Sequence, residues 1–133
     1  MKSFLNSLKI TEIPIGIILL AGLIFALSSC KKNVDTACNL AKSAIAPSAM
    51  DITFKAVKTG DGTISSLTYK VGNTEKTVTD PRLPWSVTLG ATKGSPISIT
   101  ATGRAKNGSL TISYNGENAT GAIHGSDFCK HSN

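Results

Sequence analysis

The chain has 133 residues, a formal net charge of +6 and 41% hydrophobic residues, which together are typical of one small globular domain. Aromatic residues make up only 5%, and the basic residues are scattered along the chain. A nucleic-acid binder would need a basic face with aromatic stacking platforms, so we expect no nucleic-acid partner. With two histidines and no phosphate-loop sequence, the chain offers no catalytic set, and we expect neither an enzyme nor a bound cofactor.

The first 29 residues have the three parts of an export signal. Lys2 and Lys9 give a positive start, residues 15–27 form an uncharged apolar run, and two serines precede Cys30. As a helix this run would extend about 20 Å, short of the ~30 Å hydrocarbon layer of a membrane. We therefore predict a signal peptide with a helical apolar part at residues 1–29. A single-pass anchor and a buried core helix are the alternatives.

The sequence Leu27-Ser28-Ser29-Cys30 resembles the lipobox of bacterial lipoproteins, which places an aliphatic residue three positions before the cysteine and small residues between. The resemblance implies that Cys30 is the first mature residue and that its thiol carries lipid. The partner of this end would be the membrane. The protein would then be a membrane-anchored lipoprotein of the cell envelope, facing the periplasm or the cell surface.

Residues 30–49 are rich in alanine, with Lys42 among them and Pro47 near the end. Alanine and lysine favour a short helix weakly, but fewer than about 12 residues form a marginal helix without tertiary packing. We interpret residues 30–49 as the lipidated N-terminus followed by a tether.

Once Cys30 carries lipid, Cys38 and Cys129 are the two cysteines left. An even number of thiols in an exported chain favours a disulfide between them. Such a bridge would close a loop of about 90 residues, for which chain entropy gives at most ~4.6 kcal/mol of stabilisation. Two free thiols, or pairing between chains, are the alternatives.

Residues 50–133 alternate in the two-residue period of half-buried strands. Turn residues interrupt the alternation at 59–62, 72–73 and 90–95, and Asn115-Gly116 is typical of a type I′ hairpin. Two prolines in residues 80–84 exclude a central strand, so the chain must cross over there. The predicted strands lie at 52–56, 67–71, 77–79, 85–89, 97–101, 110–114 and within 117–123. About seven short strands predict an all-β fold, a small antiparallel β-sandwich.

A family resemblance rests on the stretch from Ser66 to Ile123. It is carried by Leu67-Thr68-Tyr69, Val78-Thr79, Leu83-Pro84-Trp85-Ser86, Ile97-Ser98-Ile99-Thr100-Ala101 and Ser109-Leu110-Thr111-Ile112-Ser113-Tyr114-Asn115-Gly116. This pattern resembles the MmpS-type (mycobacterial membrane protein small) transport accessory proteins and a wider group of small envelope proteins. The resemblance implies an immunoglobulin-like sandwich outside the membrane and an accessory role beside a resistance-nodulation-division transporter. The chain departs from that family in its lipobox and in its Cys38/Cys129 pair.

Trp85 and the carboxyl end are the remaining candidate sites. Trp85 alternates with Val87 and Leu89, which places it on the core side as an anchor rather than as a ligand platform. His124, Cys129 and His131 could suggest a metal site, but zinc needs four ligands and Cys129 is expected to pair, so we expect none.

These features favour a non-enzymatic binding or accessory module of the cell envelope, with a membrane export complex as one candidate partner. The alternative function is a structural or adhesin-like surface module without a dedicated ligand.

Overall fold

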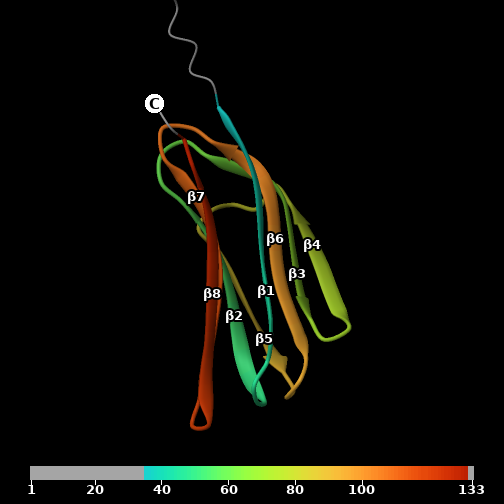
Figure 1. The fold of residues 1–133 in the computed structure, drawn as a ribbon. Helices are drawn as coiled ribbons and strands as arrows, with labels where there is room; N and C mark the ends of the chain where they lie inside the picture. The colour runs from blue at the N-terminus through green and yellow to red at the C-terminus, as the bar shows by residue number, and fades with distance from the viewer. Residues whose placement is uncertain (1–34, 132–133) are drawn as a thin grey trace, which may run out of the picture. The chain divides into compact units, whose positions relative to one another are not determined.

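In a computed structural model of the protein, residues 35–131 are described and form a sandwich of two antiparallel sheets (Figure 1). The strands are β1 (Thr36–Ile45), β2 (Met50–Lys58), β3 (Thr63–Val71), β4 (Thr74–Thr79), β5 (Trp85–Ala91), β6 (Pro96–Ala105), β7 (Ser109–Asn118) and β8 (Gly121–Lys130). One sheet has the strand order β1-β6-β3-β4 and the other the order β5-β2-β7-β8. The predicted all-β antiparallel sandwich is confirmed.

The predicted signal peptide and Cys30 lie outside the described residues. Within residues 35–131, no helix is long and apolar enough to cross a membrane. The signal peptide and the lipid anchor therefore stay predictions.

Strand β1 corrects the interpretation of residues 30–49 as a tether. Residues 36–45 pair with β6 over their whole length. Cys38 and Leu40 are buried while their neighbours are exposed, so β1 has the period of a half-buried strand. Its alanines favour a helix in isolation, but pairing with β6 and burial override that weak preference. The sandwich therefore begins at Thr36 rather than at residue 50, and it has eight strands rather than seven.

The last hairpin lies further along the chain than predicted. Strand β7 continues through Asn115-Gly116 to Asn118, which stands opposite Gly121 in β8. The Asn118 side-chain carbonyl accepts the Thr120 N–H at 2.8 Å and so closes the turn. Gly116 is buried, and a Cβ there would lie 2.5 Å from Ile52 Cδ1. The glycine is required for close packing against β2 and not for a turn.

Two other predicted connections are confirmed. Residues Gly72 and Asn73 join β3 to β4, and Gly72 has a φ of +59°, a conformation that glycine adopts without strain. Residues 80–84 carry the chain from β4 in one sheet to β5 in the other. The prolines therefore stand where the chain changes sheet.

The core lies between the two sheets and is centred on Phe54, which is fully buried. Its ring centroid is 5.7 Å from that of Tyr69, and the Tyr69 centroid is 5.3 Å from that of Trp85. Trp85 is half-buried and packs against the core from the edge strand β5. Trp85 therefore faces the core as predicted. The largest fully buried side chain of the core is that of Phe54.

The close contact at Gly116 predicts that Gly116→Ala destabilises the sandwich by roughly 1–3 kcal/mol, because the added methyl group must displace Ile52 and Met50. Gly121→Ala is the matched control, since a Cβ there meets nothing within 4 Å. Urea unfolding of both variants measures the difference. Equal unfolding midpoints for the two variants would contradict the close packing of Gly116 against β2.

Candidate functional site: one sealed side and one open side

A disulfide joins the two sheets along one side of the sandwich. Cys38 in β1 and Cys129 in β8 are bonded, with their Cα atoms 5.7 Å apart and a separation of 91 positions in the sequence. Both strands are the outermost strands of their sheets, and Figure 1 shows them running side by side. The predicted disulfide is confirmed, and it connects the first and last strands of the described chain.

Side chains of the other sheet also form hydrogen bonds with backbone groups at the outer edge of β1. The Asp127 carboxylate, on β8, accepts the Ala41 N–H at 3.0 Å. The Tyr114 hydroxyl, on β7, donates to the Ser43 carbonyl at 3.3 Å. Burial raises the pKa of Tyr114, so this hydroxyl keeps its proton through the neutral range. These groups occupy positions where the strand of a partner protein would otherwise pair.

The histidines at the carboxyl end are not brought together. His124 stands on β8 opposite Asn115, whereas His131 follows the end of β8. They are seven positions apart along an extended chain, which is roughly 23 Å. His131 Nδ1 lies 3.1 Å from the Thr36 hydroxyl, so the ring ties the carboxyl end to the start of β1. No group of three or more potential metal-ligating side chains occurs among residues 35–131.

The opposite side of the sandwich ends in β4 and β5. β4 carries Glu75 and Lys76, and the register places Lys76 opposite Tyr69, on the side that faces the core. An inward charge on an edge strand is a common device against pairing with a further strand. β5 has no charged residue in its seven positions. The edges of β4 and β5 therefore differ, because only β5 lacks a charge that would disfavour pairing with a further strand.

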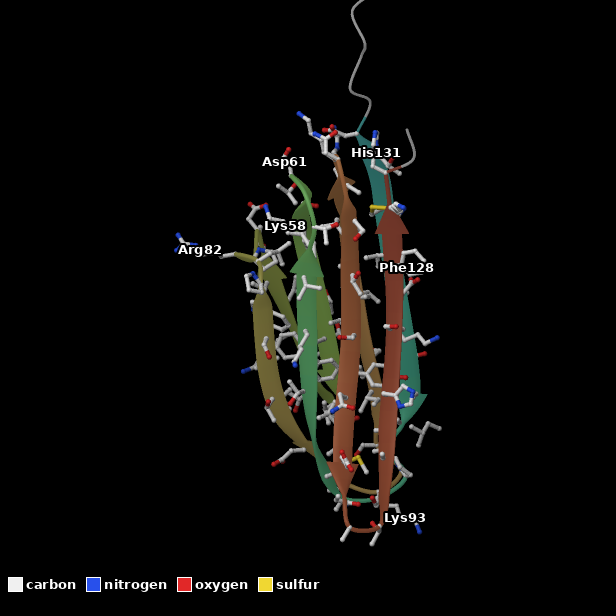
Figure 2. All side chains as sticks on the ribbon, turned by 90° about the vertical axis from the view of Figure 1, so that its left-hand side faces the viewer. Lys58, Asp61, Arg82, Lys93, Phe128 and His131 are labelled. Carbon is white, nitrogen blue, oxygen red and sulfur yellow. A yellow bond between two sulfur atoms is a disulfide. The ribbon has the colours of Figure 1, made fainter. Side chains whose placement is uncertain are left out.

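A shallow hollow of about 260 Å³ lies beside the crossover between β4 and β5. Lys58, Asp80 and Arg82 line it together with the apolar residues Ile64 and Leu83. Figure 2 shows Arg82 extending away from the strands, so the charged groups do not converge on one point. The hollow has no arrangement of a nucleophile, a base and an orienting group.

The outer face of the β5-β2-β7-β8 sheet carries two exposed apolar side chains. Val57 is 41% exposed and Phe128 is 67% exposed, and Thr111 stands between them in the register. Phe128 lies near the disulfide on the sealed side (Figure 2). Single exposed apolar residues are common on protein surfaces, so this row does not by itself mark a site.

No protein-family model, no curated protein and no solved structure matches the chain. The resemblance to the MmpS-type proteins therefore stays a prediction from the residues quoted above.

Sequence reasoning identified the cysteine pair but missed the groups that seal β1. Asp127 and Tyr114 act on β1 across 70 or more residues, and no local pattern marks them. The absence of charge in residues 85–91 is visible in the sequence. The sequence does not show that these residues form an edge strand, and only at an edge does the absence of charge leave a strand open to pairing.

The disulfide predicts a large loss of stability when both cysteines are removed. In the variant Cys38→Ala/Cys129→Ala, we expect the free energy of unfolding to fall by at least ~2 kcal/mol, with ~4.6 kcal/mol as the chain-entropy limit. For a domain of this size the melting temperature should fall by about 8 °C or more. Calorimetry with and without reductant measures this fall.

Reductant should lower the melting temperature of the wild type and leave that of the double variant unchanged. Alkylation of Cys38 and Cys129 in unreduced native protein would contradict the bridge.

Proposed function

We propose that the protein is a non-enzymatic module of the cell envelope that acts by protein contact at the open side of its sandwich. The observation that carries this proposal is the difference between the two sides. Side chains and a disulfide cover the edge of β1, whereas β5 presents an uncharged edge. Unpaired backbone groups at a sheet edge can accept the strand of a partner protein.

The disulfide supports an extracytoplasmic location. Structural disulfides form and persist in oxidising compartments such as the periplasm and the cell surface. The export signal and the lipobox-like sequence predict the same location, with Cys30 as the anchor. The resemblance to transport accessory proteins makes a membrane export complex the first partner to test.

We expect the mature protein to begin at lipidated Cys30, because alkylation of its thiol with a lipid together with acylation of its amine puts more than one acyl chain in the membrane. Two or more chains hold a protein to a membrane far more firmly than one chain does. Mass spectrometry of the mature amino-terminal peptide tests this. Cys30→Ser should leave the unprocessed precursor in the membrane. An unmodified Cys30, or a mature chain that begins at Met1, would refute the anchor.

Photocrosslinking in living cells tests the contact itself. A photoreactive residue is placed at one of three exposed edge positions: Ala41 on β1, Thr77 on β4 or Thr88 on β5. We expect protein adducts from Thr88, fewer from Thr77 because of the charges on β4, and none from Ala41. Adducts from Ala41 alone would place the contact on the wrong side, and no adduct from any position would refute the proposal.

A structural or adhesin-like surface module is the second candidate function, and the outer face of the β1-β6-β3-β4 sheet favours it. Two adjacent rows across β6, β3 and β4 contain only hydroxyl side chains. These residues are Thr100, Thr68 and Thr77 in one row and Thr102, Ser66 and Thr79 in the next. Photoadducts from Thr77 to cell-surface glycan, with none to protein, would support this candidate over the first.

A further inference from the structure

Strand β5 differs from the other edge strands in what guards it. β1 is covered by Asp127 and Tyr114, and β4 carries Glu75 and Lys76. β8 contains Asp127 and Lys130 and is joined to β1 by the disulfide. In Figure 2, β5 runs along the outer left side of the sandwich, below Arg82. The nearest charges along the chain, Arg82 and Lys93, lie outside the strand, in the crossover and in the following turn. The seven residues of β5 therefore offer a neutral edge for another strand.

The side-chain pattern of β5 restricts which registers are open to a second copy of the same strand. Directly opposite residues in an antiparallel pair project from the same face of the sheet. The outward residues Ser86, Thr88 and Gly90 must therefore stand opposite outward residues of the second copy. A two-fold axis at Thr88 satisfies this condition and leaves all seven residues paired. No other centre pairs the whole strand.

In this register the core-facing side of the joint is apolar and matched in size. Val87 stands opposite Leu89, and Trp85, the largest residue of the strand, stands opposite Ala91, one of the smallest. Trp85, Val87 and Leu89 are half-buried in the single chain. A second strand would cover the part of each side chain that is still exposed, and burial of apolar area favours association.

The outward side of the joint brings opposite charges into the same rows. On β2, Lys55 is opposite Ser86 and Asp51 is opposite Gly90. With Ser86 opposite Gly90 of the second copy, each row contains Lys55 from one copy and Asp51 from the other. The Asp51 carboxylate lies 3.6 Å from the position of a Cβ at Gly90, so it leans over the glycine toward the edge. Three strand spacings of about 4.8 Å separate the two backbones, so the arrangement avoids like charges in one row but adds little attraction of its own.

We propose that β5 pairs antiparallel with β5 of a second copy about a two-fold axis at Thr88, forming one continuous eight-stranded sheet. The charge-free edge, the size match at Trp85 and Ala91, and the absence of like charges in the Lys55 and Asp51 rows all favour a second copy as the occupant. The inference rests on the proposed function, because it names a second copy of the chain as the partner that the open edge binds.

Cysteine crosslinking in the full chain tests the register. Thr88→Cys should form a disulfide-linked dimer under mild oxidation in membranes, because position 88 stands opposite itself on the axis. Ser86→Cys should not link to itself, since position 86 stands opposite Gly90 and two copies of it lie roughly 13 Å apart along the strands. Mixed Ser86→Cys and Gly90→Cys chains should link. Wild-type protein controls for linkage through Cys30.

Thr77→Cys is the matched control for the edge. Thr77 and Thr88 are both exposed edge residues, and each has its hydroxyl 2.8 Å from a threonine hydroxyl of the neighbouring strand. Crosslinked Thr77→Cys in the absence of crosslinked Thr88→Cys would overturn the proposal. Linkage of Ser86→Cys to itself would overturn the register.

Light scattering of the full chain in detergent gives an independent measurement. Wild-type protein should have the protein mass of a dimer, and Thr88→Lys should raise the dissociation constant about fivefold or more, because the two lysines face each other across the axis. Thr77→Lys should leave the dimer intact. Circular dichroism confirms that both lysine variants are folded.

A monomeric wild type with no Thr88→Cys linkage would overturn this inference. If photoadducts from Thr88 to another protein persist in that case, the proposed function stands without the dimer. If no adducts form either, both proposals fail.

Discussion

The junction between β1 and β8 is the constraint on which the rest of the structure depends. β1 is rich in alanine and buries only a few side chains, so it contributes little apolar area to the core. It is held by its ladder to β6 and by groups from the other sheet: the Cys129 sulfur, the Asp127 carboxylate and the Tyr114 hydroxyl. Because these bonds cross between the sheets, they fix the relative position of the sheets on this side.

This junction also determines where the protein can meet a partner. A sandwich of two open sheets has four edge strands, and each is a possible site for strand addition. Here β1 and β8 are joined by the disulfide, β8 contains Asp127 and Lys130, and β4 carries a lysine on its core-facing side. The remaining neutral edge, β5, stands at the other end of its sheet from β8. The side of the sandwich with β1 and β8 is thus stabilised by bonds within the chain, and the side with β5 is available for association.

Much of the sandwich could be predicted from the sequence because alternation reports directly on burial. Residues such as Phe54, Ile99 and Ile112 lie at alternating positions, and all three are fully buried. The predictions that were wrong share one cause, because contacts between residues far apart in the sequence outweighed the conformational preference of the local segment. The alanines of β1 favour a helix weakly and the segment is too short to hold one alone, which predicts a tether, but pairing with β6 makes it a strand. Asn115-Gly116 suggested a turn, although the glycine is needed to admit Ile52. The cysteine pair was predictable from chemistry, whereas the sealing role of Asp127 depends on a contact 86 residues away.

The position of the disulfide also determines how the sandwich would respond to mechanical force. A pull on the chain ahead of Thr36 acts on β1 for only two residues before it reaches Cys38. There the covalent bond transfers the load to β8, close to where His131 meets Thr36. β1 cannot be unzipped from β6 residue by residue beyond that point while the bond is intact. The domain would therefore resist tension along its amino-terminal lead with two strands instead of one, because β1 cannot leave β6 without also pulling β8 from β7.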